Sequence, residues 1–70
     1  MTVGITRDNI TIVLQRPRYP ENIGSAARAM CNMGFKHLSV VDPGVWDEAR
    51  IRRLATHAAA SVVDNIVQFD

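Results

Sequence analysis

Three short apolar runs rich in β-branched residues set the framework of this chain. They are "NITIVLQ" (9–15), "HLSVVD" (37–42) and "IVQF" (66–69). Runs of this length and composition, each followed by proline, glycine or a polar residue, are typical of buried strands. Helical segments separate them, so the element order is β-α-β-α-β. This order predicts an α/β fold in which right-handed crossovers join the strands of a parallel sheet.

The first predicted helix follows the loop "RPRYPE" (16–21). We predict Asn22 as its N-cap, and the acidic Glu21 beside it suits the positive end of the helix dipole. Apolar residues then recur at helical spacing. Gly34 is placed to end this helix in a left-handed conformation.

A second helix is predicted to begin around Asp47. The segment "DEARIRRLA" (47–55) has acidic residues first and basic residues last, as the helix dipole favours. "THAAASVVDN" (56–65) is predicted to continue as a further helical piece. In the second predicted helix, "RIRR" (50–53) is either a phosphate-facing patch or, as is more common on amphipathic helices, a solvated face.

The chain offers few means of stabilising a small fold. A domain of 70 residues buries only about 60% of the surface that its unfolded chain exposes. Cys31 is its single cysteine, and we interpret it as a packing residue. Two isolated histidines, His37 and His57, make no metal pattern, and His57 has no visible catalytic partner. Because parallel sheets usually have helices on both faces, we expect residues 1–70 to be the N-terminal part of one larger domain.

Charge and hydropathy exclude several classes of protein. The net charge is +1 and hydrophobic residues make up 47% of the chain, which is typical of a folded domain and not of a disordered tail. No apolar run approaches the roughly 20 residues that span a membrane. The start, "MTVGITRDN", lacks the pattern of a signal peptide. We therefore expect a cytoplasmic protein with no membrane partner.

The loop after the first strand carries two arginines on either side of a proline. In open parallel sheets, ligands bind at the loops that follow the strands. A loop stiffened by Pro17 would hold Arg16 and Arg18 ready for phosphates at little cost in ordering. The alternative, with about equal weight, is a solvated loop whose arginines bind nothing specific.

Two weak helix formers, Gly24 and Ser25, stand in the first predicted helix and need a reason. Either a ligand or another backbone approaches there, or small residues let the helix lie close to the sheet. Arg28 follows Asn22 by six positions, a rise of about 9 Å, and a helical side chain leans toward the N-terminus. We therefore expect the Arg28 guanidinium to reach the space that Asn22 faces.

The stretch "YPENIGSAARAMCNMGFKHLSVVDP" (19–43) resembles the first motif region of the SpoU/TrmH-type RNA 2′-O-ribose methyltransferases of the SPOUT superfamily. That family has an apolar strand, Pro-x-Asn-Ile-Gly, a small-rich helix with an arginine six residues after the asparagine, and a strand ending in Asp-Pro or Asn-Pro. The matching residues are Pro20, Asn22, Ile23, Gly24, Arg28, Met33, Gly34, the strand 38–41, Asp42 and Pro43. The similarity covers about residues 10–70 and is strongest to the TrmJ-like branch, which acts on tRNA.

The resemblance implies a fold and an activity. The fold is a Rossmann-like parallel sheet followed by a C-terminal trefoil knot, and the enzyme is a homodimer that uses S-adenosyl-L-methionine. The family's cofactor motifs follow the region matched here, so we expect no cofactor-binding residue and no knot within residues 1–70. We also expect these residues alone to be inactive. The alternative is a stand-alone α/β module that binds RNA or protein without catalysis.

In the family, the residues matching Asn22 and Arg28 belong to the active site, where the arginine assists attack by the ribose 2′-hydroxyl. A guanidinium stays protonated at neutral pH and is therefore a poor general base. We therefore interpret Arg28 as an electrostatic element that holds a phosphate or stabilises a developing alkoxide. Asn22 would orient it, cap the helix, or both. Arg16 and Arg18, outside the motif, are predicted to contact the RNA backbone.

Overall fold

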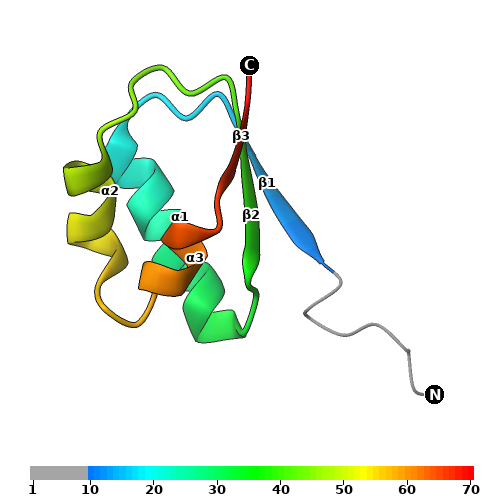
Figure 1. The fold of residues 1–70 in the computed structure, drawn as a ribbon, viewed down its shortest axis with the longest axis vertical. Coiled ribbons are helices and arrows are strands. Elements are labelled where there is room, and N and C mark those ends of the chain that lie inside the picture. Colours follow the sequence, from blue (N-terminus) through cyan, green and yellow to red (C-terminus); the bar gives the residue numbers. More distant parts are fainter. Residues whose placement is uncertain (1–9) are drawn as a thin grey trace.

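Residues 10–70, the part of the chain that the computed structural model describes, form three strands and three helices (Figure 1). The elements in chain order are β1 (Thr11–Gln15), α1 (Pro20–Met33), β2 (His37–Val41), α2 (Glu48–Ala55), α3 (Ala60–Asp64) and β3 (Val67–Phe69). The predicted β-α-β-α-β order and α/β class are confirmed, with the second helical region divided into α2 and α3. Asn9, which the sequence placed in the first strand, lies outside the described residues.

The three strands form a parallel sheet in the order β1-β2-β3. Its first pairing runs in register from Thr11 opposite His37 to Gln15 opposite Val41. One hydrogen bond continues the ladder past the end of β1 and another past the end of β2. The Arg16 N–H donates to the Val41 carbonyl, and the Asp42 N–H donates to the Phe69 carbonyl, both at 2.7 Å. The carboxyl ends of the three strands therefore lie together at one edge, called the carboxyl edge below.

All three helices cover the same face of the sheet (Figure 1). Right-handed crossovers that step from β1 to β2 to β3 in one direction place their helices on one side. The core lies between sheet and helices, and its fully buried members include Ile23, Ala27, Val40, Ile51 and Ala55.

The other face of the sheet is open within residues 10–70. Val13, Val67 and Phe69 occupy alternate strand positions on this face and are each more than half exposed. The expectation of helices on both faces is thus met on one face by the described residues.

The start of α1 differs from the sequence prediction. The helix begins at Pro20, its N-cap is Tyr19, and no side chain makes a capping hydrogen bond. The prediction of Asn22 as N-cap is therefore wrong, since Asn22 is already the third helical residue. Proline suits the first turn because its φ is preset and its missing N–H is not needed there.

The other predicted helix ends are confirmed. Gly34 follows α1 with a φ of 82°, and its N–H donates to the Cys31 carbonyl at 3.2 Å. Asp47 caps α2, because its carboxylate accepts a hydrogen bond from the Arg50 N–H at 3.2 Å. Both caps are local signals that need no knowledge of the rest of the fold.

Candidate active site

Two loops meet at the carboxyl edge of the sheet. The Gly44 N–H, after β2, donates to the Pro17 carbonyl, after β1, at 3.2 Å. Arg16 and Asp42, the first residues of the two loops, both have positive φ values, 52° and 51°. Their side chains form an ion pair with 3.9 Å between Nε and Oδ2. This edge is the place where open parallel sheets bind ligands.

The two loop arginines are accessible to an anion. The Arg16 side chain is 80% exposed, and such an exposed and long ion pair contributes little because water screens it. Arg18 is exposed and makes no hydrogen bond or ion pair with residues 10–70. Tyr19, which follows it, is 55% exposed. The RNA-contacting role of both arginines stays a prediction.

Asn22 and Arg28 both lie on the exposed side of α1. Neither side chain makes a hydrogen bond or ion pair within residues 10–70. Six helical positions separate them by about 9 Å along the axis and about 120° around it. A meeting of the two groups on one substrate would therefore depend on the length and lean of the Arg28 side chain, and it stays a prediction.

Gly24 brings α1 into backbone contact with α2. A Cβ atom on Gly24 would lie 2.2 Å from the Ile51 carbonyl oxygen and 3.2 Å from the Leu54 Cβ. The reason for this glycine is therefore the close approach of another backbone. The simpler alternative, that a small residue here lets α1 lie close to the sheet, does not explain Gly24, because its nearest neighbours belong to α2. The neighbouring Ser25 is exposed.

Glu21 and Arg50 join the same two helices through a paired contact. Arg50 Nε donates to Glu21 Oε2, and a terminal nitrogen of Arg50 donates to Oε1, both at 2.8 Å. This hydrogen bonding lowers the pKa of the Glu21 carboxyl and raises the pKa of the Arg50 guanidinium. The pair could not be predicted from the sequence, since no local pattern links residues that are 29 positions apart.

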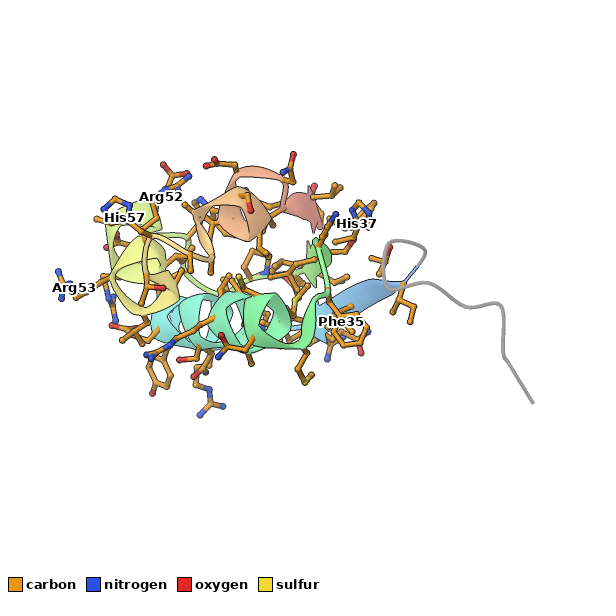
Figure 2. The ribbon with its side chains drawn as sticks, turned by 90° about the horizontal axis from the view of Figure 1, so that it is seen from below. Phe35, His37, Arg52, Arg53 and His57 are labelled. Carbon is orange, nitrogen blue, oxygen red and sulfur yellow. The ribbon has the colours of Figure 1, made fainter. Side chains whose placement is uncertain are left out.

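The remaining arginines of "RIRR" support the interpretation as a solvated helix face. Arg52 pairs with Glu48 and with Asp64. Together with Arg50, which pairs with Glu21, two of the three guanidinium groups are therefore engaged within the chain. Arg53 is exposed and points away from the ribbon (Figure 2). A phosphate-facing patch would need these groups to be available.

Two hollows lie away from Asn22 and Arg28. One, of about 600 Å³, is lined by residues 31–35 at the end of α1. The other, of about 370 Å³, is lined by Arg52, Thr56, His57 and Ala60. Figure 2 shows Phe35 and His57 at opposite ends of the helical layer. Cys31 donates its Sγ hydrogen to the Ala58 carbonyl at 3.1 Å and is partly buried, in line with a packing role.

The described residues contain neither a cluster of metal ligands nor a membrane-spanning helix. Within residues 10–70, no three His, Cys, Asp or Glu side chains come close enough to hold a metal ion. The same part of the chain has no helix long and apolar enough to cross a membrane.

Comparison with known proteins identifies the family. Residues 9–69 match the SpoU rRNA methylase family. The Escherichia coli "uncharacterized tRNA/rRNA methyltransferase LasT" is 47% identical over 60 residues, covering 86% of this chain and 26% of that protein. The Sodalis glossinidius tRNA (cytidine/uridine-2′-O-)-methyltransferase TrmJ is 43% identical, with the same two coverages.

A solved structure shares the fold. It is described as a "probable methylase family protein" from Haemophilus influenzae, with a TM-score of 0.84 and 40% identity over 93% of this chain and 27% of that one. The chain thus spans about a quarter of the length of the relatives it matches. Sequence, fold and the Pro20–Gly24 motif agree, and the chain belongs to the SpoU rRNA methylase family.

Proposed function

We propose that this chain forms the substrate side of the active site in an S-adenosyl-L-methionine-dependent tRNA 2′-O-ribose methyltransferase. The observation that carries the proposal is Arg28, an exposed guanidinium on α1 with no ion pair among residues 10–70. A relative with 43% identity is a tRNA 2′-O-methyltransferase by name. The activity is proposed for the longer protein, as a cytoplasmic homodimer, and not for residues 10–70 alone.

The carboxyl edge of the described residues does not fit the methyl donor. S-adenosyl-L-methionine carries a sulfonium, an ammonium and one carboxylate, and the exposed Arg16 and Arg18 could pair only with the carboxylate. The acidic group beside them, Asp42, is already in an ion pair with Arg16. Like charges at close range are unfavourable. The cofactor pocket is therefore proposed outside residues 10–70, and the roles assigned below concern the nucleophile and its RNA.

Arg28 is proposed to act on the charge that develops as the ribose hydroxyl loses its proton. Its guanidinium donates hydrogen bonds and accepts none, so it stabilises an alkoxide or holds the neighbouring phosphate. The proton leaves to a phosphate oxygen or to water. With helix capping excluded, the Asn22 amide is proposed to orient Arg28 or the ribose.

Arg16 and Arg18 are proposed to hold the RNA backbone. Arg16 adopts a positive φ that costs a residue with a Cβ about 1–2 kcal/mol and costs glycine little. An arginine at a position that favours glycine supports a role for its side chain. Charge-assisted contacts to phosphate are what two exposed guanidinium groups on one loop can make.

We expect Arg16→Ala to weaken tRNA binding in a salt-dependent manner. Losing one phosphate contact should reduce the slope of log K against log [salt] by about one. Fluorescence anisotropy with labelled tRNA, repeated over a series of salt concentrations, measures it. The matched control is Arg52→Ala, whose guanidinium is already paired with Asp64. An unchanged slope for Arg16→Ala would dismiss the phosphate contact.

The proposed function is tested on the intact protein with methyl-labelled S-adenosyl-L-methionine and tRNA. We expect label on the ribose of one nucleotide, located by nuclease digestion and mass spectrometry. A tRNA with a 2′-deoxynucleotide at that position should accept no label. Methylation of a base would contradict the proposal, and tRNA binding without any transfer would favour the non-catalytic module.

A further inference from the structure

The Glu21–Arg50 pair ties the first turn of α1 to the first turn of α2. Glu21 directly precedes Asn22, and both of its carboxylate oxygens accept hydrogen bonds from Arg50. A guanidinium that meets a carboxylate through two parallel bonds fixes the relative orientation of both groups, unlike a single point charge.

A second contact lies one turn further along α1. The backbone of Gly24 approaches the Ile51 carbonyl so closely that a Cβ would be 2.2 Å away. Residues 21 and 24 of α1 thus contact residues 50 and 51 of α2. The buried face of α1, with Ile23, Ala27 and Met30, sets the coarse rotation of the helix. The contacts of residues 21 and 24 with α2 narrow the rotation that remains at its first turn. No capping side chain does this at the N-terminus of α1.

We propose that Glu21 and Arg50 are positioning residues for the active site. Within the small range of rotation that the buried face of α1 allows, they select the directions in which Asn22 and Arg28 leave the helix. Seven positions separate Glu21 from Arg28, which places them within about 20° of one direction around the axis. Any rotation of the first turn is therefore carried directly to Arg28. This inference rests on the proposed function.

The test uses the intact protein, assayed for methyl transfer to tRNA under saturating cofactor. Glu21→Gln and Arg50→Gln should each lower kcat by about 10- to 100-fold, because small misplacements of catalytic groups have effects of this size. The KM for tRNA should change by less than about threefold, since the pair does not touch RNA. The exchanged pair, Glu21→Arg with Arg50→Glu, should recover at least about tenfold in kcat over the single variants.

A second ion pair provides the matched control. Arg52 and Asp64 join α2 to α3, and Arg52 is about as exposed as Arg50, at 37% and 39%. Arg52→Gln should therefore keep the parent kcat. Exposed pairs add little to stability, so all variants should fold, which circular dichroism and thermal melting verify.

Two results would overturn the inference. One is a parental kcat in both Glu21→Gln and Arg50→Gln, and the other is an equal loss in Arg52→Gln. The proposed function fails separately: if Arg28→Ala retains full turnover, the catalytic role is wrong whatever the pair does. If Arg28→Ala is inactive and the Glu21 and Arg50 variants are normal, only the positioning role is lost.

Discussion

Replacement of Arg28 by alanine in the intact protein is expected to lower kcat for 2′-O-methyl transfer by about 10²- to 10³-fold. The magnitude is that of removing one hydrogen-bond donor from a site that stabilises developing negative charge. Affinity for S-adenosyl-L-methionine should stay close to that of the parent, because Arg28 is proposed to act on the ribose. Single-turnover kinetics with tRNA and calorimetry with the cofactor measure the two effects separately.

Two variants sharpen this prediction. Arg28→Lys keeps the charge but loses the planar fork of donors, so it should recover only part of the rate. Arg53→Ala removes another exposed arginine, on α2, and should leave kcat unchanged. Loss of cofactor affinity with turnover preserved would refute the role assigned to Arg28.

Gly24→Ala is expected to give a large loss of stability. The added Cβ would meet the Ile51 carbonyl oxygen at 2.2 Å, and a backbone oxygen cannot swing aside, so α1 and α2 must separate. Overpacking of this kind costs about 1–3 kcal/mol or more, while the better helix propensity of alanine returns at most about 1 kcal/mol. We expect a net loss of about 1–2 kcal/mol in the free energy of unfolding of the intact protein, measured by denaturant titration.

Ser25→Ala is the control for this substitution. Ser25 is the neighbouring residue of the same helix and is exposed, so the added helix propensity acts without a clash. Its stability should rise by up to about 0.5 kcal/mol. A Gly24→Ala protein as stable as the parent would contradict the close contact between the two helices.

The sequence predicted those features of the fold that local chemistry determines. The three apolar runs, the glycine stop at Gly34 and the start of a helix around Asp47 each follow from neighbouring residues, and the structure has all of them. The prediction of Asn22 as N-cap was wrong because two start signals compete there. Pro20 begins the helix two residues earlier, and a cap-type residue inside the first turn looks the same in sequence.

The residues of the candidate site were predicted from a motif. The contacts between α1 and α2 that support them could not be predicted. The family pattern indicated Asn22 and Arg28, and the structure places both at the surface of α1. The reason for Gly24 and the partner of Glu21 depend on how α2 packs against α1. Such contacts connect residues 27 to 29 positions apart, and no periodicity along the chain encodes them.

The strand order has a consequence for how the fold can grow. Within residues 10–70, β1 lies at one edge of the sheet and the three helices lie on one face, so any further parallel strand beside β1 reverses the direction of winding. Right-handed connection then carries its helix across to the bare side, over Val13 and Phe69. Such a reversal opens a crevice at the carboxyl ends of β1 and the added strand. The arginine loop that follows β1 would form one wall of that crevice.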